Sequence, residues 1–238
     1  MSLRGSLCAA ASFALIAAGL ATASPPASAA PEPDSPTDLP EPGSEDSQWQ
    51  TWAADDRADA ANYDWAADSA ARGCELIEIE ITEEVDAVYN ESLGAPADLA
   101  TVRVDRLEEC EQDAGPEQER ATTEAAPAAV PPGPSRCNSG TKGPGTICIS
   151  SSGGWVNASW QYRGSGSVSG FLRVYQISTG ATGCPTGTTW LTSPTMTWSS
   201  GQTRTTSKSQ TQSGAYSAHI WRSTSIGSTT WGSTCARL

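Results

Sequence analysis

The residue types that perform acid–base chemistry are unevenly distributed along this chain of 238 residues. All 27 Asp and Glu residues lie between Glu32 and Glu124, and His219 is the only histidine. Glycoside hydrolysis usually needs a pair of carboxylic acids, and a Ser-His-Asp triad needs an acid beside its histidine. Because no acid follows residue 124, we predict no catalytic residue in the C-terminal region, and a hydrolase ranks third among the functions considered.

The cysteines indicate disulfide bonds and no metal site. Of the seven cysteines, six remain if a signal peptide that contains Cys8 is removed, and an even number in an exported chain is typical of disulfides. Zinc would need closely spaced Cys or His ligands, which this sequence lacks. We predict no metal and no cofactor. The expected pairs are Cys74–Cys110, Cys137–Cys148 and Cys184–Cys235. The last two pairs are a preference for sequential pairing, because four cysteines allow three connectivities.

Tryptophans are concentrated near the C-terminus, where they could stack on a ligand or build the core. A small domain that is poor in Leu, Ile and Phe must bury something large, so we expect about half of them in the core. Trp160 shares an alternating face with Val156 and Ala158 and is the expected core member, whereas Trp155 lies on the opposite face and is the preferred surface candidate. The predicted binding residues are Trp155, Trp190, Trp198, Trp221, Trp231, Arg163, Arg173 and Arg222.

The charges divide the chain into two parts. Residues 31–124, the acidic part, hold all 27 acids and five arginines, whereas residues 125–238, the cationic part, hold eight Lys and Arg residues and no acid. Basic residues distributed along the cationic part favour an anionic partner, but they are also common on an ordinary solvated surface. The acidic part is one candidate partner, as a mask over the cationic part, and an independent acidic domain is the alternative. Nucleic acid is not expected, because the cations form no cluster.

The first thirty residues predict export. Arg4, an apolar stretch over residues 7–20 and small residues near 21–29 are typical of a cleaved signal peptide. A membrane anchor is the alternative, but the apolar stretch is short for a span of about 20 residues. We therefore expect a secreted, extracellular protein without a transmembrane span. The acid-bearing part followed by a Ser-, Thr-, Gly- and Trp-rich module resembles exported proteins of GC-rich bacteria in composition, which assigns no functional residue.

Composition predicts the remaining segments. The predicted segments are a signal peptide (1–30), a disordered acidic Pro-rich leader (31–48), an acidic helical segment that could be a pro-region (49–114), a Pro/Ala-rich linker (115–135) and a cationic β domain (136–238). Within the helical segment, apolar spacing predicts helices over 75–93 and 98–114. Ile77, Ile79 and Ile81 also alternate, so a short strand competes at the start of the first helix.

Short alternating runs separated by Gly and Ser dominate the C-terminal region. Residues 155–162 alternate strictly, and 163–170 predict a turn that leads to a return strand over 171–177. Further strands are expected over 188–192, 195–198, 216–222 and 229–236. The fold class that follows is mainly β: a disulfide-stapled antiparallel sandwich or barrel preceded by a small acidic helical segment.

These features favour a secreted, non-enzymatic binding protein whose cationic, Trp-rich domain binds an extracellular target. The target could be a cell-surface polymer, a carbohydrate or a protein, and the residues do not distinguish among them. The alternative is a bacteriocin-like antibacterial protein released from an acidic pro-segment.

Overall fold

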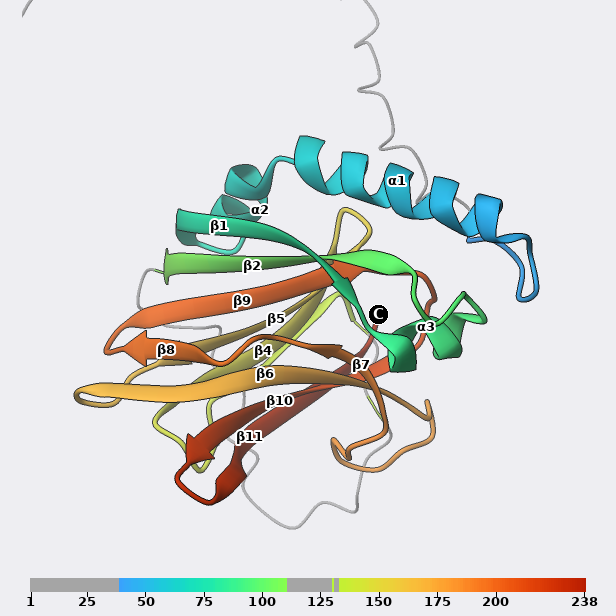
Figure 1. Cartoon of the computed structure of the whole chain (residues 1–238). Coiled ribbons are helices and arrows are strands. Elements are labelled where there is room, and N and C mark those ends of the chain that lie inside the picture. The colour runs from blue at the N-terminus through green and yellow to red at the C-terminus, as the bar shows by residue number, and fades with distance from the viewer. Residues whose placement is uncertain (1–38, 111–129, 131–132) are drawn as a thin grey trace, which may run out of the picture. The chain divides into compact units, whose positions relative to one another are not determined.

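The computed structural model describes residues 39–110, 130 and 133–238, all of which belong to one compact unit spanning residues 33–238. The predicted signal peptide, residues 31–38 of the predicted leader and most of the predicted linker lie outside the described residues. In the described part of the chain, the helices are α1 (Asp46–Asn62), α2 (Trp65–Ala71) and α3 (Ala87–Leu93). All three precede the cationic part (Figure 1). The last three residues of the leader, predicted to be disordered, belong to helix α1.

Two antiparallel sheets form the rest of the structure. The first has the order β1 (Cys74–Val85), β2 (Ala100–Cys110), β9 (Gln202–Ser209), β5 (Trp155–Tyr162), β4 (Gly145–Ser152) and β3 (Ser135–Asn138). The second has the order β11 (Gly227–Arg237), β10 (Ala215–Thr224), β6 (Ser167–Ile177) and β7 (Thr188–Thr192), and β8 (Met196–Ser199) also pairs with β6. The predicted fold class, a disulfide-stapled antiparallel β-sandwich preceded by helix, is confirmed.

Alternation along the strands places the core between the two sheets. Val156, Ala158 and Trp160 on β5 point inward and meet Leu172 and Val174 on β6 in one buried cluster. Tryptophan rings fill much of this space, as expected for a domain with few other large apolar residues. The Trp160 and Trp198 rings meet edge to face with centroids 5.3 Å apart, and the Trp198 indole N–H donates to the Trp160 carbonyl at 3.1 Å.

The helices predicted over 75–93 and 98–114 are largely wrong. Residues 74–85 and 100–110 are the paired strands β1 and β2, and only residues 87–93 are helical. The period-2 alternation was the correct signal: Val102, Val104 and Arg106 share one side of β2, which is covered by helices. Isoleucine at alternate positions stabilises a strand because β-branched side chains pack well on a pleated surface.

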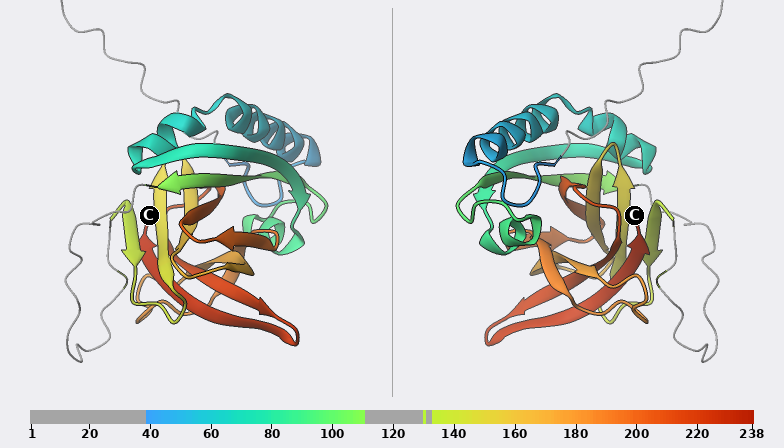
Figure 2. Two further views of the ribbon diagram at one scale, coloured as in Figure 1. Left: turned by 90° about the vertical axis from the view of Figure 1, so that its left-hand side faces the viewer. Right: turned by 90° about the vertical axis from the view of Figure 1, so that its right-hand side faces the viewer.

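Strand β2 connects the acidic part to the cationic part. It pairs with β9 from Val104↔Ser207 to Glu109↔Gln202, so both parts contribute to the same sheet. Helices α1 and α2 lie beside β1 and β2, at the end of the unit away from the β10–β11 hairpin (Figures 1 and 2). Trp49, Trp52 and Ala53 from α1 belong to the main core together with residues of the cationic part.

Six strands of the cationic part (β5, β6, β7, β8, β10 and β11) lie close to the predicted positions, whereas β3, β4 and β9 were not predicted and one expected pairing is wrong. Residues 163–170 do not connect a hairpin, because β5 pairs with β4 and β9 whereas β6 pairs with β10, β7 and β8. The chain crosses from one sheet to the other after Tyr162. Local alternation marks a strand without specifying its neighbour, since pairing depends on contacts across the whole sheet.

The three disulfides are Cys74–Cys110, Cys137–Cys148 and Cys184–Cys235, which confirms the predicted pairs. No bridge joins the acidic part to the cationic part. Among the helices that the structure describes, none combines the length and apolar character needed to cross a bilayer.

Candidate functional site

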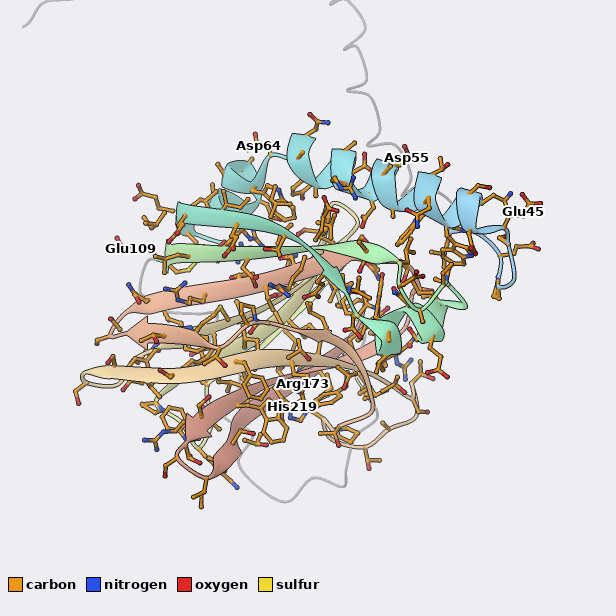
Figure 3. The ribbon with its side chains drawn as sticks, viewed as in Figure 1. Glu45, Asp55, Asp64, Glu109, Arg173 and His219 are labelled. Carbon is orange, nitrogen blue, oxygen red and sulfur yellow. A yellow bond between two sulfur atoms is a disulfide. The ribbon has the colours of Figure 1, made fainter. Side chains whose placement is uncertain are left out.

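The outer side of the second sheet carries a row of rings and one guanidinium group. Strands β6 and β10 pair in the register Phe171↔Trp221, Arg173↔His219 and Tyr175↔Ser217, which places these side chains on one side. The intervening residues on both strands face the core. We call Phe171, Arg173, Tyr175, His219 and Trp221 the aromatic–cationic face. Figure 3 shows Arg173 and His219 side by side on this part of the sheet.

The rings of this face are aligned along the two strands. The Trp221 ring lies nearly parallel to Phe171, with centroids 6.3 Å apart, and nearly parallel to His219 at 6.2 Å. The Tyr175 ring meets His219 edge to face at 5.1 Å. Phe171, Arg173 and Trp221 are partly exposed, whereas Tyr175 and His219 are buried. The partly exposed members therefore form the accessible end of the row.

Arg173 is held in place by two contacts. Its guanidinium carbon lies 5.1 Å from the Phe171 ring centroid, and its Nε donates to the Thr192 hydroxyl on β7 at 3.0 Å. The remaining N–H groups of a guanidinium can form a fork that matches carboxylate or phosphate oxygens. The face thus combines flat apolar rings with a pre-positioned cation.

His219 is enclosed by its neighbours. Its Nε2 lies 2.8 Å from the Ser217 hydroxyl, and burial lowers the pKa of the imidazole, an effect partly offset by the backbone carbonyls of Pro185 and Cys184. The Cys184–Cys235 disulfide ties these loop residues to β11, beside Ser217 on β10. The lowered pKa favours the neutral imidazole.

The Ser217–His219 pair resembles a nucleophile beside a base, but its surroundings do not suit catalysis. Ser217 is completely buried, which leaves a substrate no access to its hydroxyl. In the described part of the chain, the groups that contact the imidazole are aromatic rings, a hydroxyl and backbone carbonyls. A triad would require a carboxylate among them. The arrangement is better suited to holding the Trp221 ring than to transferring protons.

Several predicted binding residues lie in the core. Trp190 and Trp198 are buried between the sheets, where Trp190 meets Tyr216 with centroids 5.2 Å apart. The prediction that Trp155 lies at the surface is wrong. Trp155 does point away from the main core, but helix α2 covers it, and its ring meets Trp65 edge to face at 4.9 Å.

The other predicted binding residues divide between two places. Trp221 and Arg173 belong to the aromatic–cationic face. Trp231 is partly buried against Trp160, and the Arg222 guanidinium lies 4.8 Å from the Trp231 ring centroid. Arg163 is exposed in the turn after β5 and donates to the Gln161 side chain. These residues therefore do not form one continuous site.

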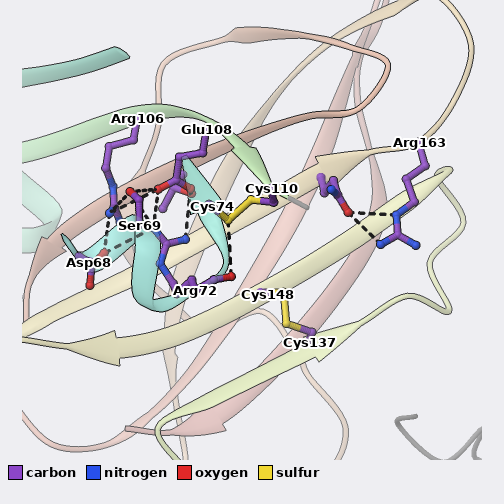
Figure 4. The surroundings of a disulfide bond; sticks show 12 residues. Asp68, Ser69, Arg72, Cys74, Arg106, Glu108, Cys110, Cys137, Cys148 and Arg163 are labelled. Atoms are coloured by element: carbon purple, nitrogen blue, oxygen red, sulfur yellow. Dashed lines mark hydrogen bonds and ion pairs between the residues drawn. A yellow bond between two sulfur atoms is a disulfide. The ribbon is translucent and has the colours of Figure 1, made fainter. Parts of the chain in front are cut away.

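A second polar cluster joins α2 to the first sheet near the Cys74–Cys110 disulfide (Figure 4). Arg106 on β2 donates to Asp68 at 2.5 Å and to Asn157 at 2.8 Å. Arg72 and Ser69 both donate to Glu108, which is completely buried. Burial would raise the pKa of Glu108, but the hydrogen bond and charge of Arg72 and the charge of Arg106 lower it overall. This cluster is a structural connection between the two parts of the chain.

A third group surrounds Lys208, whose amine is buried. Its Nζ lies 3.6 Å from the Tyr89 ring centroid and 3.8 Å from Glu84 Oε1. Burial lowers the pKa of Lys208 to about 8 and raises the pKa of the nearby Asp56 carboxyl to about 6. Both groups sit where the acidic and cationic parts meet, so their charges affect the stability of that junction.

Within the described residues, one set of metal-ligand types lies close together, namely Cys74, Glu108 and Cys110. The two cysteines are bonded to each other, so neither offers a thiolate, and Glu108 already accepts from Arg72 and Thr205. The set is therefore not a candidate metal centre.

Sequence reasoning missed Phe171 and Tyr175 as members of the face. The signal was present, because Phe171, Arg173 and Tyr175 alternate as clearly as Ser217, His219 and Trp221. What the sequence does not contain is the register that places these two runs side by side. Comparisons with protein-family models, curated proteins and solved structures find no match to this chain.

Proposed function

We propose that the chain is an exported, non-catalytic binding protein whose aromatic–cationic face binds an acidic polysaccharide at a cell surface. The observation that carries the proposal is the row of Trp221, Phe171 and Arg173 on the open side of the second sheet. Flat rings stack on the apolar faces of sugar rings, and a guanidinium pairs with the acid substituents of an anionic polymer.

Charge and location support this choice of target. The cationic part has eight Lys and Arg residues and no acid, so it offers local positive charge to an anionic polymer although the formal net charge of the whole chain is −13. The signal-like N-terminus and three disulfides fit an extracellular site of action. In the described residues the acidic part contacts β9, β5, β4 and β7 at residues outside the aromatic–cationic face.

The test is binding of the chain without residues 1–30 to a uronic-acid polymer and to its neutral counterpart. Trp221→Ala should weaken binding to the acidic polymer by about 1–3 kcal/mol, by analogy with measured ring stacking on bases. Arg173→Gln should abolish the preference for the acidic polymer. Circular dichroism must first show that each variant is folded. Unchanged binding by folded Trp221→Ala would contradict the proposal.

An enzyme is the third hypothesis, after the bacteriocin-like alternative, and His219 tests it against the binding proposal. His219→Phe keeps a flat ring beside Trp221 and Tyr175 but removes the nitrogen atoms that transfer protons. We expect this variant to retain binding and any biological activity. A folded His219→Phe chain without activity, beside an active Trp221→Ala chain, would favour catalysis.

A further inference from the structure

Strand β1 is an edge strand that exposes apolar side chains. It ends the first sheet, and among the described residues its only strand partner is β2. Ile77, Ile79 and Ile81 are 49%, 38% and 40% exposed, which is unusual for three isoleucines within one strand. An edge strand presents unpaired backbone N–H and C=O groups, so it can template the addition of another strand.

The two sides of this edge differ in chemistry. Register with β2 places Ile79 and Ile81 on the side of Arg106 and Val104, and places Glu78 and Glu80 on the other side. Within the described residues, neither glutamate forms an ion pair, unlike Glu83 and Glu84, which pair with Arg57 and Arg103. The edge therefore offers a partly exposed aliphatic row on the side that also carries α1 and α2, and unpaired carboxylates on the other side.

We propose that the β1 edge binds an extended peptide segment in which aliphatic and basic residues alternate, by strand addition. Alternate side chains of an added strand would fall beside the isoleucines and beside the glutamates, while its backbone completes the ladder. The pairing from Glu78↔Leu107 to Val85↔Ala100 is regular, and the β-bulge lies before it, between Leu76 and Glu78. The exposed stretch thus has a regular register, which an added strand could continue.

Charge argues against a second copy of this chain as the occupant. In an antiparallel pair of β1 strands centred on Ile79, Glu78 would lie opposite Glu80 of the other copy. Centred on Glu80, the two Glu80 side chains would face each other. Like charges directly opposite each other destabilise a strand pair. The chain's own segments 31–38 and 111–129 are also acidic, so they lack the complementary charge.

The alternative explanation is that Glu78 and Glu80 bind no partner and only protect the edge from aggregation, as charged residues on edge strands often do. That role would not require exposed isoleucines between them. Apolar side chains left in water forgo burial free energy of about 25 cal/mol per Å², so their exposure favours a role in which they become covered. A basic partner strand would cover the isoleucines and neutralise the glutamates at once.

The experiment measures binding of an acetylated, amidated peptide in which Lys and Val alternate, using the chain without residues 1–30. We expect saturable binding and new protection of the backbone amides of residues 78–82 from hydrogen exchange. Glu78→Gln with Glu80→Gln should weaken binding by roughly three- to tenfold, from two exposed charge pairs. Ile79→Ser with Ile81→Ser should weaken it as well. Ile226→Ser, at an exposed isoleucine in the β10–β11 turn, is the matched control and should not.

The backbone of the peptide provides the decisive comparison. An N-methylated Lys–Val peptide keeps its charge but cannot complete a ladder, so it should not bind. Equal binding by that peptide, equal binding by the Gln variant, or no binding of the Lys–Val peptide would overturn the proposal. Dimers of the chain that Ile79→Ser with Ile81→Ser dissociates would also overturn it, in favour of a second copy. If the serine variant does not fold, the isosteric glutamine variant still decides the outcome.

Discussion

At the residue scale, residues of the same type have different roles because their surroundings differ. Trp155 and Trp221 both point away from the main core, yet Trp155 is buried under α2 whereas Trp221 is partly exposed on the aromatic–cationic face. Lys208 is one of two lysines in the chain, and its amine is buried over the Tyr89 ring. Burial of ionisable groups shifts their pKa values, which makes stability depend on pH.

Asp56 offers a direct test of this effect. Burial raises its pKa from 3.8 to about 6, so the folded state binds more protons than the unfolded state between those values. The contribution of Asp56 to the free energy of unfolding should therefore fall as pH rises from about 4 to 6, by about 2–3 kcal/mol at 1.36 kcal/mol per pKa unit. Asp56→Asn should remove this loss, and urea unfolding at several pH values measures it.

The neighbouring Asp55 supplies the control, because its side chain is exposed. Asp55→Asn should leave the pH profile of the free energy of unfolding unchanged. A parallel profile for Asp56→Asn and the unsubstituted chain would show that Asp56 does not carry the effect.

At the scale of elements, the β1–β2 hairpin is the unit that sequence patterns described least well. Residues 77–81 fit both a helical and a strand period, and the Cys74–Cys110 bridge is compatible with either hairpin. Strand β2 forms because it pairs with the edge of β9 and because Ala60 and Trp65 cover its Val102 and Val104 side chains. Strand β1 then pairs with β2. Tertiary contacts thus overrode local helix propensity.

The disulfide of this hairpin should contribute measurably to stability. Cys74→Ser with Cys110→Ser opens a loop with a sequence separation of 36 residues. In the chain-entropy model this costs about 3–4 kcal/mol in the free energy of unfolding. Guanidinium unfolding of the double variant and of the intact chain measures the difference. A loss below about 1 kcal/mol would mean that β1 and β2 stay together in the unfolded state without the bridge.

At the scale of the whole molecule, opposite charge does not separate the chain into two independent bodies within the described residues. The acidic part supplies two strands of the first sheet and three helices, and the cationic part supplies the rest of the sandwich. Apolar contacts and the buried hydrogen bonds from Arg106 to Asn157 and Ser207 hold them together. Salt screens such buried contacts much less than exposed ion pairs.

Cleavage within residues 115–135 tests this arrangement, because the Pro/Ala-rich stretch is the predicted protease-sensitive site. The two fragments should remain associated in size-exclusion chromatography at both 0.1 M and 1 M NaCl. They should separate on a denaturing gel without reducing agent, since no disulfide joins them. Separation of the fragments in 1 M NaCl alone would support a mask held by exposed charges.

The sequence by itself determined the properties that depend on composition and short-range spacing. Strict alternation identified β5, and cysteine order identified the disulfide pairs. Only the tertiary structure decided which strands are neighbours and which side of each strand is covered. Those outcomes depend on contacts between residues far apart in the chain, such as Arg106 with Asn157 and Trp65 with Trp155. The period of a sequence pattern specifies which side of a strand each side chain lies on. Whether that side is buried depends on what the rest of the chain packs against it.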